Sequence, residues 1–93
     1  MGYYIEGPVL GKAAHIKSLG GVPFNLSTSY KDIPTGMIPV IVIEGGHFDA
    51  AGIAFNEEEY QVFTDPGDQR HKQGLLLDRA TVVRENPSVA SKL

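Results

Sequence analysis

The segment from Gly7 to Ala13 holds the residues whose types and spacing come closest to a chemical motif. Its sequence, Gly-Pro-Val-Leu-Gly-Lys-Ala, follows a β-prone run and precedes a helical pattern, which is the context of a phosphate-binding loop. Backbone N–H groups at a helix start, with Lys12 beside them, would hold an anion. Only three residues separate Gly7 from Gly11, and Ala13 stands where a Walker loop has serine or threonine. Gly7, Gly11 and Lys12 are therefore a candidate anion site, and the alternative is a turn with an exposed lysine.

A second candidate is the polar segment that precedes Leu75. Arg70, His71 and Lys72 follow one another there, and together they could contact an acidic partner or a phosphate group. The alternative is a solvated connection between two elements. We treat these three residues as a candidate interaction loop.

The three histidines of the chain are His15, His47 and His71, and their spacing matches no zinc-binding pattern. His47 and Asp49 could place two polar groups on one extended segment, which gives a third hypothesis, a hydrolase-type site. The chain has no cysteine, so disulfides and thiolate chemistry are excluded. It also has no Gly-x-Ser-x-Gly nucleophile motif. We expect no metal and no cofactor, and the sequence gives no support to an enzyme.

Composition narrows the class of protein further. Apolar residues make up 42% and charged residues 20% of the 93 residues, as in ordinary globular proteins. The net charge is −3 and the eight lysines and arginines are scattered, which disfavours nucleic-acid binding. The longest apolar stretch, Met37 to Ile43, is broken by Pro39 and falls short of the roughly 20 residues of a membrane span. The first residues lack a secretory signal pattern. We expect a cytoplasmic protein without membrane attachment, because small cysteine-free domains are typical of reducing compartments.

We expect the candidate site residues to lie in a small α/β domain, with α+β as the alternative fold class. We expect residues 1–86 to form one domain and residues 87–93 a flexible C-terminal tail. A single-layer sheet of three to four strands should carry two to three helices. The expected strands are Tyr3–Glu6, Val22–Leu26, Ile38–Ile43 and Leu75–Leu77.

Helix signals are of unequal clarity. Apolar residues three or four apart predict a first helix that opens after Gly7-Pro8 and ends at Gly20-Gly21. Asn56 and Glu59 form a capping-box-like pair, which predicts a helix from Glu57 to about Thr64.

Two segments stay open. The segment 48–55 is a short strand or a helical turn, with the strand favoured. The segment Arg79–Glu85 is a helix or, through Thr81–Val83, a continued strand, with the helix favoured. The expected core is Tyr4, Val9, Ala13, Ile16, Leu19, Val40, Ile41, Val42, Ile43, Ile53, Phe55, Tyr60, Phe63, Leu75, Leu76 and Leu77.

The sequence thus favours a non-enzymatic accessory or interaction module that binds another protein. The alternative is a small anion- or nucleotide-binding domain that uses the strand-turn-helix segment Gly7–Lys12.

Overall fold

The computed structural model describes residues 9–45, 48–64 and 72–92. These residues form a five-stranded antiparallel sheet in the order β1-β4-β3-β5-β2. The strands are β1 (Val9–Gly11), β2 (Val22–Phe24), β3 (Met37–Gly45), β4 (Phe48–Ile53) and β5 (Lys72–Asp78). The α-helices and 3-10 helices are α1 (Ala13–Lys17), η1 (Tyr30–Asp32), α2 (Glu57–Phe63), α3 (Arg79–Glu85) and η3 (Pro87–Lys92). The fold class is α+β, with one strand more than the sequence predicted.

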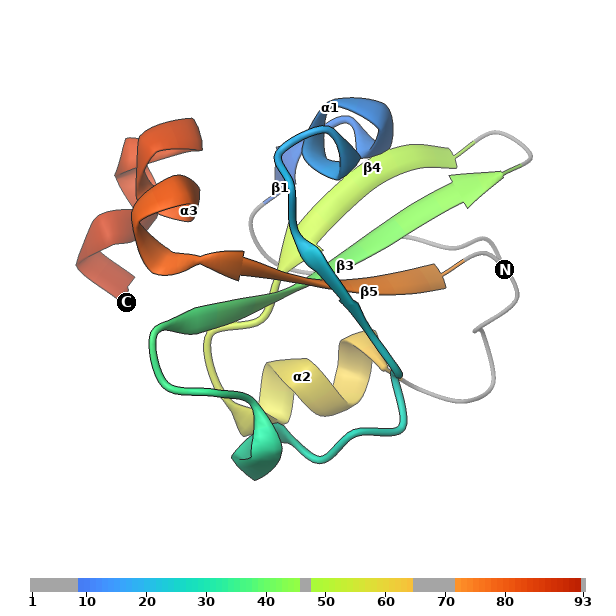
Figure 1. The fold of residues 1–93 in the computed structure, drawn as a ribbon, viewed down its shortest axis with the longest axis vertical. Helices are drawn as coiled ribbons and strands as arrows, with labels where there is room; N and C mark the ends of the chain where they lie inside the picture. Colours follow the sequence, from blue (N-terminus) through green and yellow to red (C-terminus); the bar gives the residue numbers. More distant parts are fainter. Residues whose placement is uncertain (1–8, 46–47, 65–71, 93) are drawn as a thin grey trace.

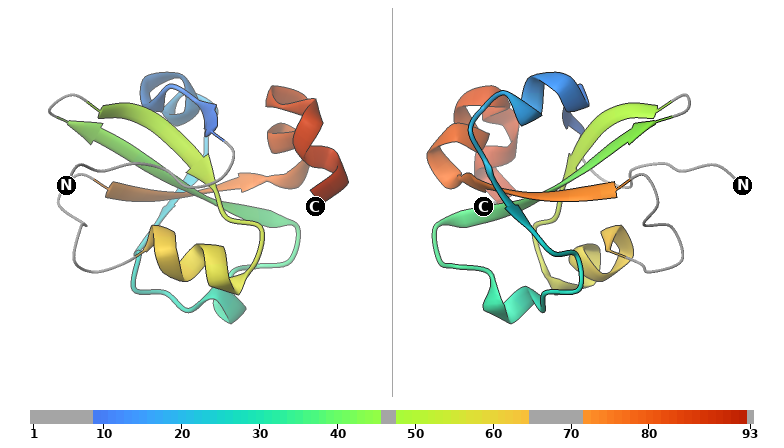
Figure 2. Two further views of the ribbon diagram at one scale, coloured as in Figure 1. Left: turned by 180° about the vertical axis from the view of Figure 1, so that it is seen from behind. Right: turned by 45° about the vertical axis from the view of Figure 1, so that its right-hand side comes forward.

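Helical elements cover both faces of the sheet (Figures 1 and 2). In Figure 1, α1 and α3 lie above the sheet and α2 lies below it. The buried residues on the α1 and α3 side are Leu10, Ala13, Ile16, Val40, Val42, Ala51, Ile53, Leu75, Leu77, Val82 and Val89. The buried residues on the α2 and η1 side are Leu26, Ile41, Ala54, Tyr60 and Phe63.

Strand β3 is the centre of this arrangement, as its sequence predicted. It pairs with β4 on one side and with β5 on the other. Side chains of a strand alternate between the faces of the sheet, so Val40 and Val42 pack under α1 and α3 while Ile41 packs over α2. A strand that is covered on both faces needs apolar residues at consecutive positions, and β3 supplies them.

The first helix is shorter than predicted, and its predicted start is wrong. Residues Val9–Gly11 form strand β1, which pairs with Gly52 and Ala51 of β4. Leu10 of this strand is buried. It therefore contributes to the core from an extended segment and not from the predicted helix. Helix α1 begins only at Ala13. The predicted strand Tyr3–Glu6 lies outside the described residues.

The two open segments are resolved in favour of the preferred interpretations. Residues Phe48–Ile53 form strand β4, and Arg79–Glu85 form helix α3. Helix α2 begins as its capping signal predicted, since the Asn56 side chain accepts a hydrogen bond from the Glu59 N–H at 2.9 Å. The Glu59 carboxylate in turn accepts from the Phe55 N–H at 2.9 Å.

The C-terminal segment differs from the flexible tail that the sequence predicted. Residues Pro87–Lys92 form η3, and the Val89 side chain is only 2% exposed within the core beside Val82. No helix in the described ranges is both long enough and apolar enough to cross a membrane.

Candidate functional site

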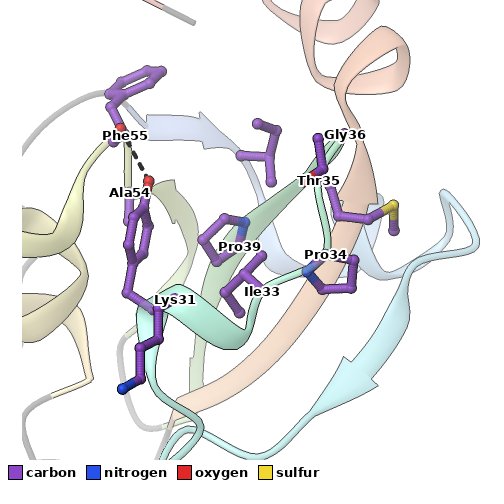
Figure 3. A pocket seen from close by; sticks show the side chains of 11 residues that line it. Lys31, Ile33, Pro34, Thr35, Gly36, Pro39, Ala54 and Phe55 are labelled. Atoms are coloured by element: carbon purple, nitrogen blue, oxygen red, sulfur yellow. Dashed lines mark hydrogen bonds between the residues drawn. The ribbon is translucent and has the colours of Figure 1, made fainter.

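A pocket of about 300 Å³ lies beside the first residues of β3. We call it the β3 pocket. Its walls come from three segments: η1 with the loop that follows it, the start of β3, and the link between β4 and α2 (Figure 3). The lining residues are Tyr30, Lys31, Ile33, Pro34, Thr35, Gly36, Met37, Ile38, Pro39, Ala54 and Phe55.

The pocket exists because β3 extends further than β4. The pairing of β3 with β4 ends at Val40 and Ile53, whereas the pairing with β5 continues to Met37. Ala54 still donates to the Pro39 carbonyl at 3.4 Å. Beyond Ala54 the chain continues to α2, so Met37 and Ile38 have a neighbouring strand on one side only. The pocket lies beside this part of β3.

The loop between η1 and β3 forms the outer wall. Its turns are fixed by hydrogen bonds from Ile33 N to Tyr30 O at 3.1 Å and from Met37 N to Pro34 O at 3.1 Å. Gly36 has φ +88°, a conformation that glycine adopts without the cost paid by other residues. This glycine lets the loop enter β3 directly.

The lining of the pocket combines apolar side chains with an equal share of polar atoms. Pro39 and Ala54 are buried, and Ile33 and Phe55 are half-buried. Lys31 is exposed, and Figure 3 shows its side chain running away from Ile33 and Pro39. The apolar side chains of this lining favour an apolar group over an ion.

Aromatic contacts hold the inner wall in place. The Tyr30 hydroxyl donates to the Phe55 carbonyl at 3.3 Å (Figure 3), and the Tyr30 ring packs against Tyr60 with 5.4 Å between ring centroids. The Tyr60 hydroxyl donates to the Thr28 carbonyl. Burial raises the pKa of Tyr60 above its ordinary value, so the neutral hydroxyl is the form that the fold stabilises.

Phe55 links this wall to the C-terminal segment. The Lys92 ammonium lies over the Phe55 ring, 5.7 Å from its centroid. This distance is within the range of a cation–π interaction. Phe55 therefore connects the pocket with both α2 and η3.

The described residues of the predicted anion site, Gly11 and Lys12, do not line the β3 pocket. Gly7 is outside the described residues. Gly11 pairs with Ala51 in the sheet, and Lys12 is exposed immediately before α1. The Ala13 N–H donates to the Asp49 carboxylate at 2.9 Å. The first amide of the helix is therefore engaged by the protein's own carboxylate, and anion binding at this segment stays a prediction.

Of the predicted interaction loop, only Lys72 belongs to the described residues. It begins β5, and its ammonium donates to the Phe63 carbonyl at the end of α2, at 3.1 Å. A cation at this position stabilises the negative end of the helix dipole. Its observed contacts are structural, and the role of Arg70, His71 and Lys72 in partner binding stays a prediction.

Asp49, the one described residue of the third hypothesis, does not line the pocket. His47 lies outside the described residues, and the Asp49 carboxylate accepts the bond from Ala13. His15 pairs with Glu85 at 2.8 Å and Lys17 with Glu44 at 2.7 Å. Within the described ranges, no three His, Asp or Glu side chains come together as metal ligands would.

Two further hollows border β2 at the edge of the sheet. One, of about 370 Å³, lies beside Phe24 and Gly74, and the other, of about 250 Å³, lies beside Gly21 and Leu77. Val22, which lines the second hollow, is 55% exposed. Pro23 lacks an N–H, which limits how a further strand could pair with β2. The β3 pocket lies instead beside the central strand, and we take it as the candidate site.

Sequence reasoning missed the β3 pocket. The one available signal was Pro39 within the most apolar strand, since proline cannot donate a hydrogen bond to a neighbouring strand and so interrupts the pairing on one side. Comparison of the chain with protein-family models, with curated proteins and with solved structures finds no match.

Proposed function

We propose that this chain is a non-enzymatic protein-interaction module, and that the β3 pocket binds an apolar side chain of a partner protein. The observation that carries the proposal is a pocket lined in part by apolar side chains beside a central strand whose first residues β4 does not cover. Its volume of about 300 Å³ is at the lower end of small-ligand pockets, which suits one side chain better than a large cofactor. We further propose a cytoplasmic partner, because small cysteine-free domains are typical of reducing compartments.

The energetics fit a reversible contact. Burial of a leucine-sized side chain contributes about 1.5–3 kcal/mol, or roughly 10- to 150-fold in affinity. A single side chain therefore binds weakly, and contacts around the pocket must supply the remaining affinity.

The first experiment is an NMR titration of the ¹⁵N-labelled chain with N-acetyl-leucine methylamide. We expect saturable amide shifts at Ile33, Thr35 and Ile38, which surround the pocket. Shifts spread over the whole surface, or the absence of saturation, would contradict the proposal.

Matched variants locate the binding site. Thr35 lines the pocket and is exposed, so Thr35→Trp should obstruct the pocket without removing a core contact. Gln61 is exposed on α2 and does not line the pocket, so Gln61→Trp is the control. We expect at least a tenfold loss of affinity in the first variant and no change in the second.

The same labelled sample tests the alternative. Titration with phosphate and ATP would shift the amides of Gly11, Lys12 and Ala13 if this segment binds anions. Saturable shifts there, without shifts at the β3 pocket in the leucine titration, would replace the interaction module by an anion-binding domain.

A further inference from the structure

Met37 is the one sulfur-containing residue within the described ranges 9–45, 48–64 and 72–92. It lines the β3 pocket and also the hollow of about 250 Å³ beside Gly21 and Leu77. The residue is half-buried. A side chain that borders two hollows and is partly exposed is open to small solutes, so the reactivity of its sulfur bears on the pocket.

The backbone on both sides of Met37 is fixed by hydrogen bonds. The Met37 N–H donates to the Pro34 carbonyl at 3.1 Å, and the Arg79 N–H donates to the Gly36 carbonyl at 3.0 Å. Met37 also pairs with Asp78 of β5. The side chain can therefore change chemically while these backbone bonds are kept, and such a change alters the wall of the pocket more than the fold.

The chemistry open to this side chain is oxidation by a peroxide. The thioether sulfur attacks one peroxide oxygen, the O–O bond breaks, an S–O bond forms and water leaves. The sulfur loses two electrons and the peroxide gains them. The product, methionine sulfoxide, is polar where the thioether was apolar, and methionine sulfoxide reductases convert it back.

From these observations we infer that Met37 is an oxidation site that regulates the β3 pocket. The thioether form binds the apolar side chain of the partner, and the sulfoxide form binds it more weakly. A bound apolar side chain offers the sulfoxide oxygen no hydrogen-bond donor, so binding removes water from this oxygen without replacement. The inference rests on the proposed function and adds its regulation.

The first experiment measures how fast Met37 is oxidised in the folded chain. Hydrogen peroxide is added to the folded chain and to the chain unfolded in urea, and mass spectrometry of peptides follows the gain of oxygen at Met37. Since oxidation follows exposure, we expect the two rates to agree within about tenfold. If Met37 stays unmodified in the folded chain while the unfolded chain is converted, the inference is wrong and the proposed function is unaffected.

The second experiment compares NMR titrations of the oxidised and unoxidised chains with N-acetyl-leucine methylamide. We expect the oxidised chain to bind roughly two- to thirtyfold more weakly. Treatment with methionine sulfoxide reductases should restore the affinity. The matched control is Met37→Leu, because leucine has a similar volume and no sulfur. Its affinity should be the same before and after peroxide treatment.

The outcomes separate the two proposals. Equal affinity of the oxidised and unoxidised chains would overturn the inference and leave the pocket of the proposed function intact. An equal loss of affinity in peroxide-treated Met37→Leu would assign the effect to another residue, and the inference would again be wrong. If the unoxidised chain shows no saturable shifts at the pocket, both proposals are wrong.

Discussion

The Asp49 carboxylate on β4 accepts a hydrogen bond at 2.9 Å from the backbone N–H of Ala13, 36 residues earlier in the chain. The cap residue of α1, Lys12, makes no side-chain cap of its own. Helix α1 has five residues, which is too short to be stable by itself in water. The Asp49 carboxylate on β4 thus provides the N-terminal cap of α1 that Lys12 does not provide.

Replacement of Asp49 should destabilise the protein through this contact. We expect Asp49→Ala to lower the free energy of unfolding by about 0.5–2 kcal/mol, the usual effect of losing a helix cap. Urea unfolding followed by circular dichroism measures the change. Asp78→Ala is the matched control, because Asp78 precedes α3 without a side-chain cap. An equal effect of both variants would argue against a specific role of Asp49.

The buried position of Val89 predicts that the C-terminal segment contributes to stability. Val89→Ala removes a side chain that is 2% exposed, and we expect a loss of about 1.5–3 kcal/mol. Ser91→Ala, at an exposed site in the same 3-10 helix, should change the free energy of unfolding by less than about 0.5 kcal/mol. A flexible tail would instead make both substitutions neutral in thermal or urea unfolding.

Gly74 lies too close to its neighbours for a larger residue. A Cβ atom at this position would lie 2.6 Å from the Phe24 ring and 2.9 Å from the Leu26 side chain. We expect Gly74→Ala to destabilise the protein by about 1–3 kcal/mol. Gly11→Ala is the control, since its nearest contact would be an ordinary 3.5 Å from Ile16. Thermal unfolding of the two variants measures the difference.

The raised pKa of Tyr60 predicts a loss of stability at alkaline pH. The tyrosine hydroxyl has an ordinary pKa of about 10, and burial raises the pKa of Tyr60 in the folded state. The folded protein therefore retains the proton more strongly than the unfolded chain. The resulting stability is fully present below about pH 10 and is lost as the pH rises through the folded pKa. Urea unfolding across this range should show a shallower decline for Tyr60→Phe, and an identical decline would contradict the assignment.

The sequence correctly predicted those helices and strands that are determined by residues close together in the chain. The cap of α2 depends on Asn56 and Glu59, three residues apart, and the structure confirms it. The consecutive apolar residues of β3 indicated a central strand, and the structure confirms that as well.

The errors concern contacts between distant parts of the chain. Residues Val9–Gly11 have a helical pattern, yet they pair with β4, and no local pattern contains that partner. Val89 likewise belongs to a core cluster that includes Val40 and Ile53, which lie far from it in the sequence. The β3 pocket depends on where β4 ends relative to β3, which a single sequence does not reveal.

The strand order also constrains how the chain can acquire its structure during synthesis. Both edge strands, β1 and β2, precede their partners β4 and β5 in the sequence. Strand β2 cannot pair until residues 74–76 of β5 have been synthesised. Chains emerge from the ribosome N-terminus first, at about 5–20 residues per second. The β3–β4 hairpin, whose strands are adjacent in sequence, should therefore form before the edges join it. For several seconds the exposed Val22 and its neighbours have no strand to pair with, and this interval is when a nascent chain is most open to aggregation or to a chaperone.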